Sequence, residues 1–428
     1  MTRTLPMLCL GLLSCGPLPR HPALDGTATS AAPDDHPLVA LVEERTLTRV
    51  DASGPTPLFT FGEGIDADFV KVMQWGLEGD VIGAFAFLPK QGQREATYEF
   101  VLVSTTGKVL FRQLRREDGH PFVHFGADGS LTVSGSKGFI ARVDGSVTDL
   151  GELVPMTPVL ASGAVIVSRG RPWEPASPKF LWRAGALSPL PADLGSGRPI
   201  LLVAGRAFVV TGRELVSLEG GKPIALPGES LGLVQAQGHF LVLASESKET
   251  VVLVDVERNT AQVVANVPKP DSRYGTWNVA VSDGGAVLAG QRLEGKLQLR
   301  RTVNAGATWK NVGDPMTPGE DPGAGTWLFS MERGGSVMVL SMSTGYGHFV
   351  NGRQFVTSAG ASHVAADGNF VNAVELLGSM DISPDGQVTT TWQQHRDAPS
   401  ELMVIDAKGT RHVVLTASTP GQVRFLQR

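Results

Sequence analysis

The chain has 428 residues, of which 42% are hydrophobic and 18% are charged, a composition typical of a soluble folded protein rather than a disordered or membrane-embedded one. Its formal net charge of −5 comes from scattered acidic and basic residues without a basic stripe, which excludes nucleic acid as a partner bound through its phosphates. The 51 glycines and 28 prolines place turns close together, so the segments between them are short.

The first residues have the features of a targeting segment. Arg3 is followed by an apolar stretch that is too short to cross a hydrocarbon core of about 30 Å as a helix. The next residues resemble the lipobox of bacterial lipoproteins; they are Leu12, Leu13, Ser14 and Cys15. The resemblance implies that residues 1–14 are a signal peptide and that Cys15 is acylated, which would anchor the protein in the bacterial cell envelope. The resemblance also implies sorting to the outer membrane, because the residue after the cysteine is Gly16 and not an aspartate, which would favour retention in the inner membrane.

Residues 15–36 are rich in Pro, Ala, Ser and Thr and poor in large apolar side chains. This composition predicts a flexible tether between the lipid and a folded domain. The two cysteines are Cys9 and Cys15. Cleavage before Cys15 would remove the first and consume the second, so no disulfide would remain. The alternative to this leader is a frayed or buried first strand with a chance cysteine.

From Pro37 onward, short apolar runs turn at a glycine and return, at intervals of 33 to 51 residues. The glycines of these first turns are Gly79, Gly129, Gly163, Gly205, Gly238, Gly285, Gly335 and Gly386. A second series of tighter hairpins falls between them, from VDASGPTPLF at its start to VNGRQFV and IDAKGTRHVV near its end. Two hairpins in each repeat make four antiparallel strands.

Four-stranded units that recur at this interval predict an all-β fold, a β-propeller formed by residues 37–428 as a single domain. Eight first turns and a composite unit formed by the chain ends give eight or nine blades; we predict eight, within a range of seven to nine. A ring must be sealed, because unpaired edge strands invite aggregation. We therefore expect residues 423–427 to pair beside residues 38–61 in one blade.

The triplet GTW opens two of the repeats, at 275–277 and at 325–327. In the first of them, Trp277, Val279 and Val281 fall on one face of a strand, because side chains alternate along a strand. We expect this face to pack against the neighbouring blade.

One hairpin, TVNAGATW, resembles the Asp-box or BNR repeat of sialidase-type propellers, whose pattern is Ser/Thr-x-Asp-x-Gly-x-Thr-Trp. A short polar side chain at the Asp position would bond turn amides, the glycine would adopt a conformation that other residues resist, and the Trp would anchor the hairpin. The resemblance implies a structural role, away from the active-site face, for Thr302, Asn304, Gly306, Thr308 and Trp309.

The catalytic residues of sialidases have no evident counterpart in the chain, which has three tyrosines and no Arg-Ile-Pro element. Tyr98 and Glu99 are adjacent, so on a strand they would point to opposite faces. His120 and His124 are four apart, which on a strand puts both on one face, but no nearby carboxylate or cysteine completes a metal site. We predict no catalytic residue, no metal and no cofactor.

In a propeller, the loops that join strand two to strand three, and strand four to the next blade, gather on one face. Aromatic and arginine side chains on such loops commonly form recognition surfaces. The candidate ligand-binding residues are Arg94, Arg171, Trp173, Arg273, Tyr274, Tyr346, His348, His395 and Arg396.

The sequence therefore predicts a monomeric, envelope-anchored lipoprotein whose propeller is a non-enzymatic binding or scaffolding module. Its partner would be an envelope protein or a glycan, and its contact with the membrane would be through the lipid anchor alone. The alternative is a hydrolase or lyase that acts on glycan or cell-wall material through a loop-built site.

Overall fold

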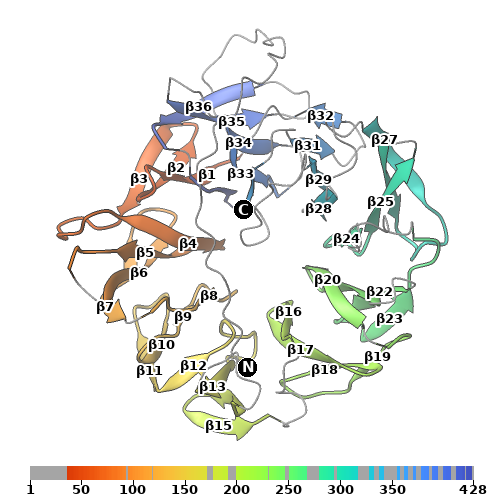
Figure 1. Cartoon of the computed structure of the whole chain (residues 1–428), viewed down its shortest axis with the longest axis horizontal. Helices are drawn as coiled ribbons and strands as arrows, with labels where there is room; N and C mark the ends of the chain where they lie inside the picture. Colours follow the sequence, from red (N-terminus) through yellow and green to blue (C-terminus); the bar gives the residue numbers. More distant parts are fainter. Residues whose placement is uncertain are drawn as a thin grey trace, which may run out of the picture.

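The structure is a computed structural model of the chain. It describes residues 36–426 apart from 93–94, 118, 171–176, 191–198, 230, 246–249, 268–278, 294–295, 317–326, 332–336, 342–353, 357–360, 365–369, 373–376, 385–387, 394–398, 406–410 and 420. Every helix or strand recorded among the described residues is a β-strand. Small antiparallel sheets follow one another around a ring in chain order (Figure 1), so the prediction of an all-β propeller is confirmed.

Six sheets contain four strands each, paired in the order in which they occur in the chain. They are β4 (Lys71–Glu78), β5 (Val81–Leu88), β6 (Ala96–Ser104) and β7 (Val109–Glu117); β8 (Val123–Phe125), β9 (Leu131–Val133), β10 (Gly138–Ala141) and β11 (Val147–Gly151); β12 (Leu153–Pro155), β13 (Val165–Arg169), β14 (Lys179–Arg183) and β15 (Ala186–Pro189); β16 (Leu201–Val203), β17 (Arg206–Thr211), β18 (Glu214–Ser217) and β19 (Ile224–Ala225); β20 (Leu231–Gln237), β21 (Phe240–Ser245), β22 (Val251–Asp255) and β23 (Thr260–Val263); and β24 (Val279–Val281), β25 (Val287–Leu293), β26 (Lys296–Thr302) and β27 (Lys310–Met316).

The two ends of the chain share one sheet, which we call the closing sheet. It contains β1 (Leu38–Val42), β2 (Thr46–Asp51) and β3 (Gly54–Thr60), with β37 (Val423–Phe425) beside β1. Leu38 pairs with Phe425, and Ala40 pairs with Val423. The backbone N–H of Phe425 also donates to Asp381 Oδ2 at 2.8 Å. Asp381 lies in β33, so this hydrogen bond joins the closing sheet to the sheet that precedes it in the ring. The predicted closure by the chain ends is confirmed.

In the last two sheets before the closing sheet, one strand pairs outside the sheet of its neighbours in the chain. One contains β28 (Trp327–Met331), β29 (Val337–Ser341), β31 (Ala361–Val364) and β32 (Phe370–Asn372). The other contains β33 (Leu377–Ile382), β34 (Thr389–Gln393), β35 (Ser400–Ile405) and β36 (Arg411–Ala417), with β30 (Gln354–Val356) added beside β33. The segment VNGRQFV, expected to turn between two strands of one blade, thus ends in a strand of the next. The described residues form nine sheets, within the expected range of seven to nine and one more than the favoured eight.

The glycine turns occupy the predicted position, between the first and second strands of their sheets. Six of the eight lie among the described residues, at φ angles from +55° to +76°. These are Gly79, Gly129, Gly163, Gly205, Gly238 and Gly285. Residues with a Cβ rarely adopt this left-handed conformation, so the sequence pattern follows directly from the backbone geometry that a tight turn needs.

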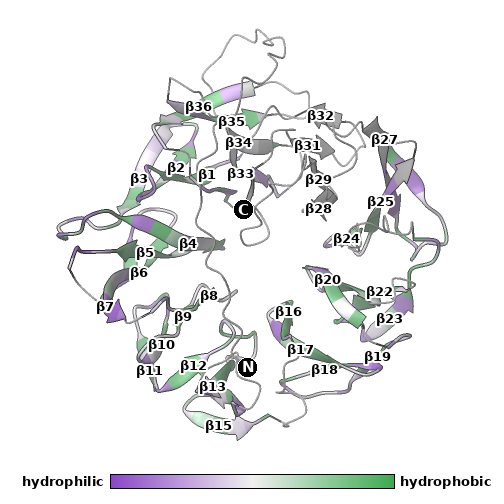
Figure 2. Ribbon diagram, viewed as in Figure 1, coloured by the Kyte–Doolittle hydropathy of each residue, from purple (hydrophilic) through white to green (hydrophobic). Residues whose placement is uncertain are grey.

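Apolar side chains seal the seams between neighbouring sheets. The middle strands are the most buried, as in β5, whereas the outer strand β7 is largely polar and exposed (Figure 2). Val279 and Val281 pack in one cluster with Phe240 of the preceding sheet, as expected for that face of the repeat. Trp277 lies outside the described residues, so its part of the expectation stays a prediction.

Candidate functional site

The connections predicted to carry recognition residues leave one edge of the sheets. In the β4–β7 sheet this edge is where β5 ends and β6 begins, and the connections from β3 to β4 and from β7 to β8 reach the same edge. All nine candidate ligand-binding residues lie outside the described residues, as does Cys15, and their roles stay predictions. They are Arg94, Arg171, Trp173, Arg273, Tyr274, Tyr346, His348, His395 and Arg396.

Four aromatic rings meet at this edge, and we call Phe69, Phe87, Tyr98 and His120 the aromatic cluster. Phe69, which is 54% exposed, meets Phe87 edge to face with ring centroids 5.9 Å apart. The Phe87 ring lies 5.4 Å from that of Tyr98 and 6.1 Å from that of His120. Phe122, two residues after His120, is 48% exposed. The cluster therefore runs from the interior of the seam to the surface.

A hydrogen bond of 2.8 Å joins Tyr98 Oη to His120 Nδ1 at the base of the cluster. Tyr98 is 1% exposed, whereas His120 is exposed. Burial raises the pKa of Tyr98 above its usual value, and the negative charge of Glu117 raises it further. The tyrosine is therefore a neutral hydroxyl that orients the exposed histidine.

Glu117 is a buried carboxylate on the same face of the sheet, at 3% exposure. Its Oε2 accepts a hydrogen bond of 2.7 Å from the backbone N–H of Ser136. A Cβ at Gly135 would lie 2.6 Å from Oε1, so a larger residue there would force the carboxylate to shift. Oε1 lies 3.9 Å from Arg115 Nε and has no hydrogen-bond partner among the described residues.

Glu99, one residue after Tyr98, faces the closing sheet instead, as the alternation of the strand predicts. It is fully buried, and its two oxygens accept hydrogen bonds of 2.7 Å, from Gly62 N and from Arg112 Nε. The Arg112 guanidinium also lies 5.7 Å from the centroid of Phe59. Both carboxylate oxygens are satisfied, which marks Glu99 as part of the seam between the closing sheet and the β4–β7 sheet.

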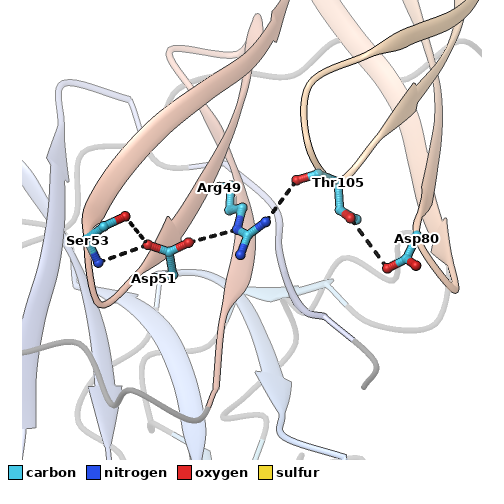
Figure 3. Close-up of polar contacts among 5 residues, drawn as sticks. All are labelled: Arg49, Asp51, Ser53, Asp80 and Thr105. Atoms are coloured by element: carbon cyan, nitrogen blue, oxygen red, sulfur yellow. Dashed lines mark hydrogen bonds and ion pairs between the residues drawn. The ribbon is translucent and has the colours of Figure 1, made fainter.

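The opposite edge of the same seam carries a chain of polar contacts (Figure 3). Arg49 Nε lies 2.9 Å from Asp51 Oδ2, and Arg49 Nη1 donates to the carbonyl oxygen of Thr105 in the next sheet at 3.3 Å. Thr105 Oγ1 donates in turn to Asp80 Oδ1 at 3.5 Å. A hydrogen bond from the Ser53 hydroxyl lowers the pKa of Asp51. These contacts join turns of two sheets and present no unsatisfied carboxylate.

The Thr302–Trp309 hairpin joins β26 to β27, the third and fourth strands of their sheet. It therefore belongs to the same set of turns as the one between β2 and β3, opposite the edge that carries the aromatic cluster. Asn304 Oδ1 accepts from Thr308 N, and Thr302 Oγ1 accepts from Gly306 N, each at 2.9 Å. Gly306 has a φ of +83°, and a Cβ there would lie 2.0 Å from the carbonyl oxygen of Ala265.

The hairpin is fastened to the preceding sheet. Trp309 Nε1 donates to the carbonyl oxygen of Ala265 at 2.9 Å, and Ala265 N donates to the carbonyl oxygen of Ala305 at 2.9 Å. Trp309 also packs against the apolar cluster that contains Phe240. The hairpin thus connects the sheet that contains β26 to the residues that follow β23.

The two histidines of HPFVH do not form a pair on one strand face. The strand begins at Val123, so His120 lies before it and the alternation of side chains does not extend to it. His124 lies in β8, between Val123 and Phe125, which pack on the cluster that contains Tyr98. Burial lowers the pKa of His124 below its usual value. In the part of the chain that the structure describes, no three His, Cys, Asp or Glu side chains are grouped to hold a metal ion.

The phenylalanines of the site were not predicted, because the sequence search favoured Trp, Tyr and Arg on loops. A signal was present, since Phe69 follows a polar stretch, GIDAD, and Phe122 lies between a proline and a short strand. Aromatic residues at such places have no strand to bury them.

No helix in the described ranges has the length and apolar character required to cross a bilayer.

No known family model matches the chain, and no characterised protein matches it in sequence. Among solved structures, it is similar to dipeptidyl peptidase 4 of Porphyromonas gingivalis, at 12% identity over 91% of this chain and a TM-score of 0.46. The match spans 59% of the peptidase's own length.

Two further structures of similar fold can be compared. The β-propeller domain of the trilobed protease from Pyrococcus furiosus is 10% identical, over 72% of this chain and 96% of that one, with a TM-score of 0.38. Apo AztD from Citrobacter koseri is 11% identical, over 92% and 98%, with a TM-score of 0.41. Likenesses this distant say nothing about activity, substrate or partners.

Proposed function

We propose that the protein is a non-enzymatic binding module that recognises its partner through the edge that carries the aromatic cluster. The observation that supports this is the exposure of Phe69, at 54%, on top of rings that are packed beneath it. An exposed aromatic side chain that is held by its neighbours loses little freedom on binding, and such residues dominate the affinity of interfaces. Phe122, at 48% exposure, extends the apolar surface.

The alternative reading, a glycan- or cell-wall-directed hydrolase or lyase, needs two carboxylates that converge on a substrate. The two buried glutamates of the β4–β7 sheet lie on opposite faces of it, Glu99 toward the closing sheet and Glu117 toward the β8–β11 sheet. They therefore do not form such a pair. The binding module is the function that the described residues support better.

We propose two further parts of this function from the sequence. Acylation at Cys15 would hold the module at the cell envelope, with residues 15–36 as its tether and the outer membrane as the favoured site. Its partner would then be an envelope protein or a glycan, met by a monomer. Replacement of Cys15 by alanine should release the protein from the membrane fraction, and an intact Met1 on the native protein would contradict the proposal.

We also propose that the Thr302–Trp309 hairpin is an Asp-box with a structural role. Its hydrogen bonds support this, because they close the turn and fasten it to the neighbouring sheet. The hairpin belongs to the turns opposite the aromatic cluster, so it is not expected to contact the partner.

The binding proposal is tested by a pull-down in which the tagged protein is immobilised. Detergent-solubilised cell envelope is passed over it, and the amounts of captured envelope protein and glycan are measured. Phe69→Ala should lower capture about fivefold or more, which corresponds to roughly 1 kcal/mol. The matched control is Val303→Ala, because Val303 is an exposed apolar residue, at 72%, on the opposite set of turns. Equal capture by wild type, Phe69→Ala and Val303→Ala would overturn the proposal.

A further inference from the structure

The hydroxyl of Tyr98 has one hydrogen-bond partner within the described part of the chain, His120 Nδ1 at 2.8 Å. At 1% exposure, Tyr98 does not meet bulk water. A buried hydroxyl whose proton finds no acceptor costs about 1–3 kcal/mol. The hydroxyl therefore donates its proton to Nδ1, and its raised pKa keeps the proton on the oxygen.

This hydrogen bond decides where the proton of the histidine lies. A neutral imidazole has one protonated and one unprotonated nitrogen, and the nitrogen that accepts a hydrogen bond is the unprotonated one. His120 therefore carries its hydrogen on Nε2. The side chain is exposed, and Nε2 makes no hydrogen bond to a described residue. The cluster thus offers one N–H donor on an exposed side chain, and Phe87 lies between it and the exposed ring of Phe69.

We propose that the aromatic cluster binds peptide segments that present an aromatic side chain next to a free backbone carbonyl. The incoming ring packs on Phe69 and Phe87, and His120 Nε2 donates a hydrogen bond to the carbonyl oxygen. Tyr98 is a positioning residue, because it sets the tautomer of His120 without touching the ligand. This inference rests on the proposed function and specifies the ligand of the same site.

Two features favour a peptide over a sugar. A sugar ring brings several hydroxyl groups that each need a partner on binding, whereas the cluster offers a single donor between hydrocarbon rings. Phenylalanine rings also attract other aromatic rings in edge-to-face and offset arrangements. The acceptor is expected to be a neutral carbonyl, because the four described side chains of the cluster include no lysine or arginine and Lys90, three residues after Phe87, is paired with Asp66.

The tautomer is tested by NMR on chain with ¹⁵N-labelled histidine, at about pH 9, where imidazole side chains are neutral. The His120 signals are assigned by their loss in His120→Gln. Wild type should show Nε2 as the protonated nitrogen and Nδ1 as the unprotonated one. Tyr98→Phe, which keeps the buried ring and removes one oxygen, should give a mixture of tautomers, and a thermal melt checks that it is folded. The same tautomer population in both proteins would overturn the inference.

The ligand class is tested with N-acetylphenylalaninamide as the probe and N-acetylglycinamide, which lacks the ring, as its control. The first should shift the His120 Nε2 signal of wild type, and Tyr98→Phe should bind it about fivefold more weakly, as expected for a weakened hydrogen bond of about 1 kcal/mol. No shift with this probe, or an equal shift with both, would overturn the ligand class. If Phe69→Ala still lowers capture from the envelope, the proposed function survives that failure; if capture is unchanged while the probe binds, the proposed function fails instead.

Discussion

The two faces of β6 show how neighbouring residues of one strand come to have different roles. Glu99 faces the closing sheet, where both of its oxygens accept hydrogen bonds and no part of it is exposed. Tyr98 faces the β8–β11 sheet and reaches the surface through His120, next to a carboxylate, Glu117, with one oxygen that no described residue satisfies. Both oxygens of Glu99 thus have partners, whereas one oxygen of Glu117 has none among the described residues.

The difference teaches that burial alone does not distinguish a structural carboxylate from one near the proposed binding site. Glu99 and Glu117 are both nearly inaccessible to solvent, at 0% and 3%. What separates them is the count of satisfied acceptors and the exposure of the side chains around them. Buried polar groups are nearly always satisfied in folded proteins, so an exception directs attention to its surroundings.

The largest effect is expected from opening the ring at the closing sheet. Deletion of residues 421–428 removes β37, which pairs with β1, and the buried side chains of Val423, Phe425 and Leu426. Loss of this apolar burial should cost roughly 5 kcal/mol or more. A thermal melt should show a large fall in the melting temperature, and an unchanged melt would argue against closure by β37.

Trp309→Ala tests a second sealed seam, far along the chain from β6. The substitution removes a large ring from an apolar cluster and the hydrogen bond from Nε1 to Ala265. The free energy of unfolding should fall by about 3 kcal/mol or more, while the folded fraction keeps its partner binding. Asn304→Asp, which restores the usual Asp-box residue, is the control and should be neutral or mildly stabilising. Full stability with loss of binding in Trp309→Ala would invert the assignment of the two edges.

Glu99→Gln tests the satisfied carboxylate of β6 directly. The amide group of glutamine has one acceptor, so one of the two donors, Gly62 N or Arg112 Nε, would face an NH₂ group. We expect the free energy of unfolding in denaturant to fall by about 1.5–3 kcal/mol, the range for hydrogen bonds to charged groups, and binding to be unchanged. A loss of binding in protein that keeps its stability would erase the distinction between the two faces.

Glu117→Gln is the matched substitution on the other face, and its cost should be smaller, under about 1 kcal/mol. The glutamine oxygen still accepts from Ser136 N, and the amino group replaces an oxygen that has no partner among the described residues. Removal of the charge should also lower the pKa of Tyr98, because Glu117 raises it. An ultraviolet titration of tyrosine ionisation, with Tyr98→Phe to identify the signal, checks this shift. A pKa that stays the same would show that burial alone sets it.

Phe69→Ala should change stability least, within about 0.5 kcal/mol, because more than half of the side chain is exposed. It is also expected to lower partner capture most. Chemical denaturation and capture on the same preparation would separate the two effects. A stability loss as large as that of Glu99→Gln would place Phe69 in the fold rather than in the site.

Much of the fold could be predicted from the sequence, because turns and strand faces obey local rules. A glycine such as Gly129 adopts its φ of +75° whatever surrounds the sheet, and the opposite orientations of Tyr98 and Glu99 follow from alternation. The described residues form nine sheets, inside the predicted range although eight was favoured, because a first turn does not show whether its strands form a separate sheet. The exchange of β30 was also hidden, since no local signal states which of two neighbouring sheets a strand joins.

The site was harder to predict than the fold, because it depends on contacts between distant segments. Phe69 and His120 come from different connections and meet around Phe87, which a pattern along the chain does not reveal. The sequence pattern instead suggested that His120 lies on a strand with His124, whereas the strand begins at Val123. The pairing of Tyr98 with His120 depends on how the strand end and the next connection pack, which is a tertiary property.

The pairing of β1 with β37 also bears on the order in which the molecule folds. Most strand pairs in the ring join segments that are close in sequence, so each sheet needs only short loops to form. The pair Leu38 and Phe425 joins the first and the last of the described strands, so it forms only when these two distant segments meet. Until then, β1 exposes an unpaired backbone edge to solvent. The protein is therefore expected to be more prone to self-association while β37 is unpaired than once the ring has closed.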